Sequence, residues 1–472
     1  MSTGKKILNP EDWNLSYDSS GELKFNKFKL IDLASRYGTP LYILNEKMLT
    51  DNVEKFKNNS LRIFNGNSSV YYPFKCNSVP AVVEAVKLAG LSAEVMTEFE
   101  LELALKSGFD PSEIIVNGPC KTDRFLFNCI KSKVSLIVID SISELLSLTK
   151  IPDSSSSKVN LLLRVNPDFI PKGLSKSSAT GSKSCSFGLN EREIIQALKI
   201  IENYPNFKFR GIHFHIGTGI RNPKSFNKVV KKLYPLFRKI KSLGLEIEII
   251  DVGGGFASMT TRELSSFEML AYQAVSRYQL KFGNQKFYSF EDYMTEINKS
   301  VMGFFGSKSP KIFFEPGRCI VSPAQFLLLK VYRVKIRDGK KWLITDGGLG
   351  TITMPTYYEY HEMFLCNEFK RNPQEKVTVT GPCCFASDLV YKNKLLPKVN
   401  EGDILALMDT GAYFNTLESS FNFNKPAIVS INGENCKIVR RRETFSDMIE
   451  RDNNKKIPNQ KENYHEICSS QK

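Results

Sequence analysis

Short runs of apolar and β-branched residues alternate with amphipathic helical stretches between about residue 46 and residue 320. Three of the helical stretches are Val79–Ala89, Asp123–Lys131 and Phe226–Leu243, and they fall between the apolar runs. This alternation is typical of parallel βα units, and eight such units over roughly 250 residues have the size of a (β/α)₈ barrel. The expected barrel strands are Ser69–Lys75, Leu91–Val95, Glu113–Asn117, Ser135–Ile139, Val159–Val165, Lys208–Phe214, Glu246–Asp251 and Lys311–Phe314.

The pattern changes after about residue 320, where β-rich runs separated by turn signals replace the alternation. One of these signals is Asn432-Gly433, a dipeptide that favours a tight hairpin. We therefore expect an N-terminal segment at 1–45, a barrel at 46–320, a β-sheet domain at 321–450 and a polar, disordered tail at 451–472. The expected strands of the β-domain are Leu327–Ile336, Lys341–Thr345, Val377–Thr380, Ile404–Met408, Ala427–Val429 and Cys436–Val439.

Composition is that of an ordinary soluble, globular enzyme. Of 472 residues, 42% are apolar and 24% are charged, and we find neither a membrane span nor a signal-peptide core. The ten cysteines include no Cys-x-x-Cys pair, which fits a reduced cytoplasm and argues against a zinc knuckle or a redox pair. The net charge of +15 comes from lysines spread over the chain. Without a nucleic-acid-binding motif, this charge predicts a lysine-rich surface that favours an anionic cofactor or substrate and no nucleic acid.

Lys75 is the first candidate for chemistry. In a (β/α)₈ barrel the active-site residues come from the carboxyl ends of the strands, and Lys75 ends the first expected strand. A lysine at that place is costly unless its charge is used or its pKa falls, and a lysine of low pKa is what a Schiff base requires. The alternative is a side chain that simply reaches solvent past the strand end.

A glycine-rich loop follows the seventh expected strand. Gly253, Gly254 and Gly255 are consecutive, and such a run lets backbone N–H groups close around a phosphate. Barrel enzymes often hold phosphate in the loops after strands seven and eight, and Arg318 in the second loop is a natural further contact. A flexible turn and a surface salt bridge are the alternative explanations.

Glu315, at the end of the eighth expected strand, indicates the kind of cofactor. A carboxylate can pair with a protonated ring nitrogen and keep that nitrogen positive. A pyridinium ring is a much better electron sink than a neutral pyridine.

His213 and His215 share the end of the sixth expected strand, where residues two apart face the same way. Such a pair invites a zinc site, but the other two histidines, His361 and His465, lie outside the barrel. We therefore expect no metal. The pattern favours an imidazole packed against a planar cofactor, with Thr218 helping to hold its phosphate.

Together these segments resemble the fold-type III, pyridoxal-phosphate-dependent decarboxylases of the diaminopimelate and ornithine kind. The match covers nearly the whole chain, and the motifs agree in order and spacing. It implies a barrel, a C-terminal β-sandwich or β-barrel-like domain completed by the N-terminal segment, and a homodimer with active sites at the subunit interface. The matching segments are Gly38–Tyr42, Tyr72–Asn77, Gly211–Gly219, Gly253–Gly255, Glu315–Arg318 and Met408–Tyr413.

The resemblance also implies roles for individual residues. Lys75 would carry pyridoxal 5'-phosphate, His215 would stack on its ring and Glu315 would bind its pyridine nitrogen. Cys384, supplied by the partner subunit, or Lys75 would return the proton after CO₂ has left. The remaining cofactor-binding residues would be Glu94, Arg164, Thr218, Gly253, Gly254, Gly255, Gly317, Arg318 and Tyr413. The residues on the substrate side would be Met354, Tyr358, Cys384, Phe385 and Tyr413.

The departures from the family pattern fall on the substrate side. The family arginine that commonly grips the distal carboxylate is Met354 here, and the acidic residue that usually follows the family cysteine is Phe385. Both changes remove polar contacts, so we expect α-decarboxylation of an amino acid with an altered distal pocket. The alternatives are a decarboxylase of a D-amino acid or of a siderophore-type conjugated amino acid, a racemase of the same fold, and a non-catalytic homologue that binds a partner protein.

Overall fold

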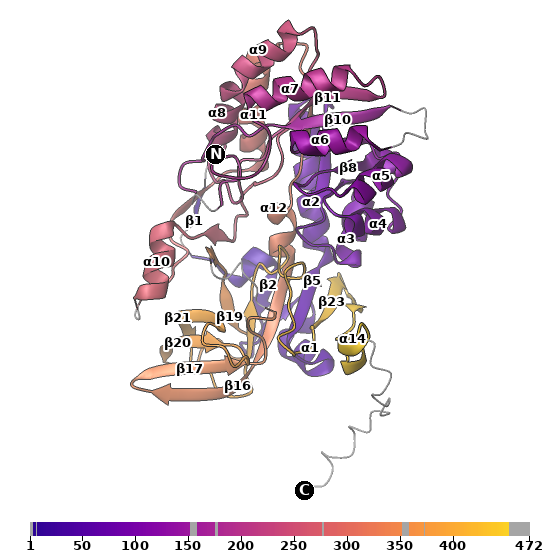
Figure 1. Ribbon diagram of the computed structural model, residues 1–472. Coiled ribbons are helices and arrows are strands. Elements are labelled where there is room, and N and C mark those ends of the chain that lie inside the picture. Colours follow the sequence, from indigo (N-terminus) through magenta and orange to yellow (C-terminus); the bar gives the residue numbers. More distant parts are fainter. Residues whose placement is uncertain are drawn as a thin grey trace.

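Eight parallel strands close into a barrel in the upper half of the molecule, in the order in which they occur along the chain (Figure 1). The computed structural model describes residues 3–5, 7–151, 158–174, 178–275, 278–351, 358–371 and 373–452, so the expected tail lies outside them from residue 453 onward. The barrel strands are β6 (Ser68–Pro73), β7 (Ser92–Val95), β8 (Ile114–Val116), β9 (Leu136–Ile139), β10 (Val159–Arg164), β11 (Phe207–His213), β12 (Ile249–Asp251) and β15 (Lys311–Phe314). Each overlaps a strand expected from the sequence, which confirms the (β/α)₈ barrel.

The inside of the barrel has a small core of its own, separate from the main hydrophobic core. Successive side chains of a strand point to opposite faces, so every second residue points inward and packs in layers. Rings of Tyr71 and Phe313, on neighbouring strands, lie 4.9 Å apart in this core. Its members are Tyr71, Ile115, Leu136, Val138, Leu162, Ile249 and Phe313.

Helices surround the barrel, and one expected helix is wrong in its extent. The stretch Phe226–Leu243 forms two helices, because Pro235 lies in the first turn of the second one, where a missing N–H is tolerated. The helices around the barrel are α2 (Glu46–Ile63), α3 (Pro80–Leu88), α4 (Glu98–Lys106), α5 (Asp123–Ser132), α6 (Ile142–Thr149), α7 (Glu191–Glu202), α8 (Lys224–Lys232), α9 (Tyr234–Ser242), α11 (Phe290–Phe305) and the short α12 (Arg318–Val321).

The lower half of the molecule is a β-domain, and the N-terminal segment helps to build it (Figure 1). Strand β5 (Leu41–Asn45) pairs with β16 (Gln325–Arg337) on one side and with β23 (Ala427–Asn432) on the other. The expected hairpin connects β23 and β24 (Asn435–Arg440), with Gly433-Glu434 as the two-residue loop after Asn432, one position later than the dipeptide indicated. The other strands of this sheet are β17 (Lys340–Thr345), β19 (Met363–Leu365), β20 (Gln374–Thr380), β21 (Leu389–Pro397) and β22 (Ile404–Leu407).

Several short elements were not apparent in the sequence pattern. An insertion between β12 and β15 contains β13, α10 and β14, and β13 pairs with β18 of the β-domain, which ties the two halves together. Strands of two or three residues are too short to show a period of their own. These elements are β1 (Thr3–Lys5), β2 (Leu15–Tyr17), β3 (Leu23–Phe25), β4 (Phe28–Lys29), α1 (Leu30–Tyr37), β13 (Arg262–Glu263), α10 (Ser266–Ala274), β14 (Gln285–Phe287), β18 (Glu359–Tyr360) and α14 (Phe445–Ile449).

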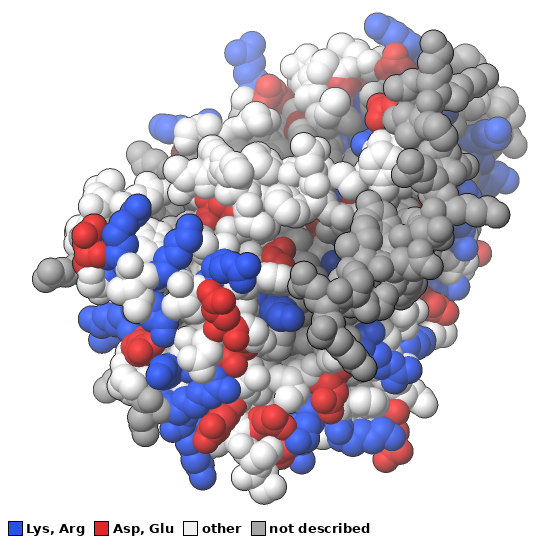
Figure 2. All heavy atoms as spheres, turned by 90° about the horizontal axis from the view of Figure 1, so that it is seen from below, with Lys and Arg blue, Asp and Glu red and all other residues white. Residues whose placement is uncertain are grey.

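The surface of the β-domain carries charges of both signs. Seen from below, lysine and arginine side chains are interspersed with aspartate and glutamate over the visible described face (Figure 2). In the part of the chain that the structure describes, no helix combines the length and the apolar character needed to span a membrane.

Candidate active site

The carboxyl ends of the strands bring polar side chains together at one pole of the barrel. A polar residue ends or directly follows each of β8, β9, β10, β12 and β15. Each stands two positions after a residue of the inner core, so its side chain points toward the inside of the barrel. This parity explains why residues far apart in the sequence meet there. The five polar residues are Asn117, Asp140, Arg164, Asp251 and Glu315, and all are buried.

Lys75 lies two residues beyond the end of β6, and its charge is used inside the protein. Its Nζ is 2.5 Å from Oε2 of the buried Glu94, on the neighbouring strand β7. Burial lowers the pKa of Lys75, but the carboxylates of Glu94 and Glu315 outweigh burial and raise this pKa above its usual value. The lysine therefore keeps its proton in the protein without cofactor. We expected either that the charge of Lys75 is used or that its pKa falls, and the lowered pKa is wrong.

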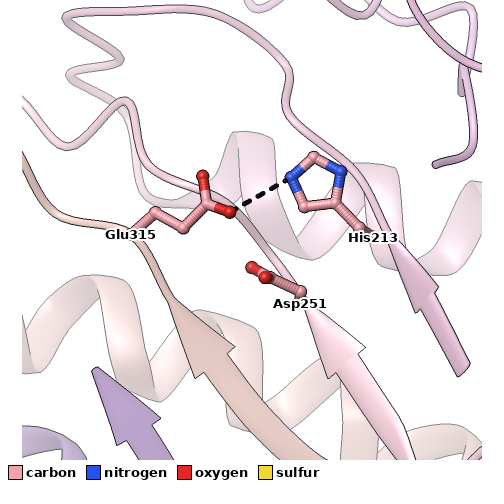
Figure 3. A group of neighbouring side chains, drawn as sticks. All are labelled: His213, Asp251 and Glu315. Atoms are coloured by element: carbon pink, nitrogen blue, oxygen red, sulfur yellow. Dashed lines mark ion pairs between the residues drawn. The ribbon is translucent and has the colours of Figure 1, made fainter. Parts of the chain in front are cut away.

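Glu315 follows β15 and lies in a buried cluster with Asn117, His213 and Asp251. Figure 3 shows His213 and Asp251 beside it. Asn117 Nδ2 donates a hydrogen bond to Glu315 Oε1 at 3.1 Å, and it lies 3.2 Å from His213 Nε2. His213 Nε2 itself is 3.5 Å from Glu315 Oε1. Asp251, the last residue of β12, completes the cluster, because β12 lies between β11 and β15.

The spacing of this cluster also occurs in metal sites, but its atoms already contact one another and Asn117. Ligand atoms of His213, Asp251 and Glu315 all lie within 4.8 Å of one another. The positive charges of Lys75 and Arg164 act on the same Glu315 carboxyl. Burial first, and then the charge of Arg164, hold the pKa of His213 well below its usual value, so its ring is neutral. We therefore interpret the group as a hydrogen-bonding cluster around Glu315.

His215 lies beyond the end of β11 and contacts the glycine loop. Its Nδ1 accepts a hydrogen bond from the backbone N–H of Gly254 at 3.1 Å. Burial, helped by the charges of Arg164 and Lys75, lowers the pKa of His215 to about 3, so this ring is neutral as well. The two histidines thus have different hydrogen-bond partners, although both rings feel the charges of Arg164 and Lys75.

The glycine loop is needed for close approach of three strand ends. Gly253 donates its N–H to Asp251 Oδ1 at 2.8 Å, and Gly254 donates to His215, so two of its three N–H groups already have protein acceptors. A Cβ on Gly254 would lie 2.3 Å from the carbonyl oxygen of Glu315. A Cβ on Gly255, whose φ is +89°, would lie 2.1 Å from the carbonyl oxygen of Gly217.

Arg318 begins α12 and forms a buried ion pair. Its Nη1 lies 2.6 Å from Oε2 of Glu359, and its Nε donates to Thr218 Oγ1 at 3.3 Å. The surface salt bridge considered from the sequence is therefore wrong, because both partners are buried. Glu359 was not singled out in the sequence, and its charge balances that of Arg318.

Tyr413 and Gly317 pack this end of the site against the segment that carries Lys75. The ring centre of Tyr413 lies 4.9 Å from the guanidinium carbon of Arg318, and its backbone N–H donates to Cys76 O at 2.7 Å. A Cβ on Gly317 would meet the side chain of Cys76 at 3.0 Å. The Arg318 end and the Lys75 end are thus parts of one packed unit.

The expected substrate-side residues lie in two places. Tyr358 is in contact with the Arg318 guanidinium, and burial raises the pKa of its phenol to about 12. Cys384 and Phe385 lie on the loop between β20 and β21, where both are exposed, Phe385 to 50%. Met354 lies outside the described residues.

Asp388 holds the β20–β21 loop in place. Its Oδ2 accepts the N–H of Cys383 at 2.7 Å, and its Oδ1 accepts the N–H of Leu349 at 2.6 Å. The exposed side chains of Cys384 and Phe385 are therefore presented by an anchored loop.

Residues 50–322 match the protein family described as pyridoxal-dependent decarboxylase, pyridoxal binding domain. The chain belongs to this family. It is 31% identical over 442 residues to the diaminopimelate decarboxylase of Methanothermobacter thermautotrophicus, which covers 92% of this chain and 96% of that protein. The crystal structure of diaminopimelate decarboxylase from M. jannaschii is similar with a TM-score of 0.81 and 27% identity, over 93% of this chain and 97% of that one. A lysine/ornithine decarboxylase from Vibrio vulnificus shares the fold, with a TM-score of 0.67 and 23% identity over 86% of this chain and 98% of that one.

This decarboxylase uses pyridoxal phosphate to remove the carboxylate of an amino acid, as the sequence predicted. The residues at the barrel pole fit such a cofactor. They offer the amine of Lys75 and the buried carboxyl of Glu315. They also offer the guanidinium of Arg318, which lies beside the Thr218 hydroxyl. One buried carboxylate oxygen, Glu94 Oε1, has no hydrogen-bond partner among the described residues, as expected where a polar ligand belongs.

Sequence reasoning missed Asn117, Asp140, Asp251 and Glu359 as members of the site. The first three carry a readable signal, since each stands two residues after an inward-pointing apolar residue at a strand end. Glu359 carries no such signal, because its partner Arg318 lies 41 residues earlier and the two meet only through the fold.

Proposed function

We propose that the barrel pole is the cofactor site, with Lys75 as the covalent attachment point and Glu315 as the partner of the ring nitrogen. The Lys75–Glu94 ion pair carries this proposal, because it holds the Lys75 side chain at the strand ends where barrel enzymes place their chemistry. Neutral His215 would pack against the ring. Arg318 would contact the phosphate, together with Thr218, Gly253, Gly254, Gly255 and Tyr413. Arg164 and Gly317 complete the cofactor set.

Bound pyridoxal phosphate supplies an electron sink for the bond that breaks. Glu315 keeps the ring nitrogen positive, and Asn117 holds the Glu315 carboxyl in place. Glu94 orients the Lys75 amine before the cofactor arrives and balances its charge. Cys384 or Lys75 delivers a proton to the carbon that has lost CO₂.

We further propose that the active enzyme is a homodimer in which the Cys384 loop of one subunit completes the site of the other. The exposure of Cys384 and Phe385 on an anchored loop supports this assembly. Within each chain we propose a barrel at 46–320 and a β-domain at 321–450 with the N-terminal segment, the pairing of β5 being the support. Free thiols at the nine cysteines of the described residues support a location in the cytoplasm.

For the substrate, we propose an amino acid handled as diaminopimelate decarboxylases handle theirs, with a less polar distal end. The family arginine and the family acid are replaced by Met354 and Phe385. A site without these polar contacts loses its main means of selecting a short diamino acid. A D-amino acid or a conjugated amino acid is the second candidate, and the same two positions favour it.

A CO₂-release assay on the cofactor-loaded protein tests the substrate proposal. The panel contains meso-diaminopimelate, L- and D-ornithine, L- and D-lysine, arginine and citryl conjugates of diamino acids. We expect the enzyme to prefer meso-diaminopimelate only weakly over the other amino acids. Release only from another member of the panel would identify Met354 and Phe385 as the substrate switch. Efficient release from meso-diaminopimelate alone would contradict the altered pocket, and no release from any amino acid would contradict decarboxylation itself.

A further inference from the structure

Two carboxyl groups meet at the centre of the barrel pole, although only Glu315 has a proposed role. Asp251 ends β12 and Glu315 follows β15, the strand next to it. Figure 3 shows the carboxyl of Asp251 directed toward the space between Glu315 and His213. Asp251 Oδ1 accepts the N–H of Gly253 at 2.8 Å, whereas no N–H group of the described residues donates to Oδ2.

The cations that face this pair are committed to other carboxylates. Lys75 pairs with Glu94 at 2.5 Å, and Arg164 pairs with Asp140 at 3.0 Å. His213 is neutral, because burial and the nearby positive charges hold its pKa well below its usual value. Two buried carboxylates a few ångströms apart cannot both ionise without a cation of their own.

The titration behaviour of the two groups agrees with this geometry. Burial raises the pKa of Asp251 to about 7, while the Gly253 N–H and a hydrogen bond with Glu315 oppose the rise and Glu94 adds to it. Burial, followed by the charges of Asp251 and Glu94, raises the pKa of Glu315 well above its usual value, against Lys75 and Arg164. The phenol of Tyr71, on β6, also feels the charge of Asp251 and stays neutral.

We propose that Asp251 and Glu315 share one proton in the cofactor-free protein, and that the positively charged ring nitrogen of the cofactor displaces this proton into solvent. The O–H bond of the carboxyl pair breaks, the ring keeps its own N–H, and the cofactor's positive charge replaces that of the proton. Asp251 is then a positioning residue that sets the charge of Glu315. This inference rests on the proposed pairing of Glu315 with the ring nitrogen.

Calorimetry on the cofactor-free protein measures the displaced proton directly. The probe is deoxypyridoxine phosphate, which lacks the aldehyde and so forms no bond with Lys75. Titration at neutral pH in two buffers of different ionisation enthalpy gives the number of protons released for each molecule bound. The matched variant is Asp251→Asn, since asparagine keeps an oxygen for the Gly253 N–H but cannot ionise.

Wild-type protein should release roughly one proton more than Asp251→Asn, because the charge of Asp251 is gone in the variant and the asparagine amide can donate its own N–H to Glu315 in place of the shared proton. A deaza analogue has CH in place of the ring nitrogen. Its binding to wild-type protein should release about one proton fewer than the binding of deoxypyridoxine phosphate. Equal proton release from wild type and Asp251→Asn would overturn the proposal. So would equal proton release from wild type with deoxypyridoxine phosphate and with the deaza analogue. Absence of a visible absorbance band after loading with pyridoxal phosphate would instead contradict the cofactor site itself.

The pH dependence of stability gives a second measurement if the variant binds the probe poorly. An unfolded aspartate gives up its proton near ~4, whereas folded Asp251 holds it until about 7. Between these values the folded protein binds more protons, so its free energy of unfolding falls as the pH rises. Asp251→Asn should flatten this fall in urea titrations of the cofactor-free protein, and an unchanged slope would count against the shared proton.

Asp409→Asn is the control. Asp409 is also buried, burial raises its pKa to about 6, and it lies outside the cluster, where it accepts a hydrogen bond from Thr260 at 2.5 Å. This variant should also flatten the fall of stability with pH, but it should leave the proton release on probe binding as in wild type. A change in proton release in Asp409→Asn would show that any buried carboxyl has this effect, and it would overturn the specific role of Asp251.

Discussion

The barrel pole and the β20–β21 loop differ in whether their side chains find partners within the same chain. At the pole, Lys75, Glu94, Glu315 and Arg318 are held by partners from other strands, and most are buried. On the loop, Cys384 and Phe385 are exposed, although Asp388 anchors the backbone beneath them. The side chains at the pole thus have their partners within the chain, whereas those of Cys384 and Phe385 face outward.

This difference has a physical reason. A buried charge is costly unless it is paired inside the fold, and Glu94 pairs with Lys75 and Glu359 with Arg318 at the pole. An exposed cysteine and phenylalanine need no such partners and can vary without unfolding the protein. We therefore expect that substitutions that change the substrate fall on the loop, and that substitutions at the pole are tolerated less.

The largest effect should follow from Lys75→Ala. Loss of the amine removes covalent attachment and should lower turnover by about a thousandfold or more. Borohydride reduction followed by peptide mass spectrometry locates the cofactor, with Lys121→Ala as a control for a buried lysine that pairs with Glu144 at 2.9 Å. Cofactor still attached in Lys75→Ala would show that the pole is not the attachment site.

Glu315→Ala should come next in size. The cofactor should remain attached through Lys75, but turnover should fall by about 10²–10³-fold, because the ring nitrogen loses the group that keeps it positive. Absorbance spectra report attachment and CO₂ release reports turnover, with Glu315→Asp expected to recover part of the rate. Near-normal turnover in Glu315→Ala would remove this carboxyl from the mechanism.

A mixture of Cys384→Ala chains with inactive Lys75→Ala chains tests whether the exposed loop works in the partner subunit. Cys384→Ala and Lys75→Ala chains, mixed under conditions that exchange subunits, should recover roughly a quarter of wild-type activity, since half of the dimers are mixed and each of these has one complete site. Each variant alone is the control. If native mass spectrometry shows mixed dimers and the activity stays absent, the pole and the loop do not form a shared site.

The smallest effect is expected from Phe385→Glu, which restores an acidic residue after the cysteine. It should raise kcat/KM for meso-diaminopimelate relative to α-aminopimelate, which lacks only the distal amine, by about tenfold, because a carboxylate can bind that amine. Phe385→Leu keeps an apolar side chain and should leave the ratio unchanged. An equal ratio in all three proteins would place substrate selection elsewhere than on this loop.

Much of the fold could be predicted, because it follows from local periodicity. Each barrel strand was expected within three residues of its observed ends, and Asn432-Gly433 predicted its hairpin. Lys75 and Glu315 were found because they are polar residues at the ends of apolar strands. The lowered pKa of Lys75 was wrong, since it depends on Glu94, a partner on another strand.

The sequence by itself determined the barrel, the glycine loop and the identity of the residues at the strand ends, since each depends on neighbours a few positions away. Only the tertiary structure decided which of these residues meet. Asn117 and Glu315 are 198 residues apart, and they form a hydrogen bond because the barrel closes in one register. Register and closure are set by packing of the whole sheet, which no local pattern encodes.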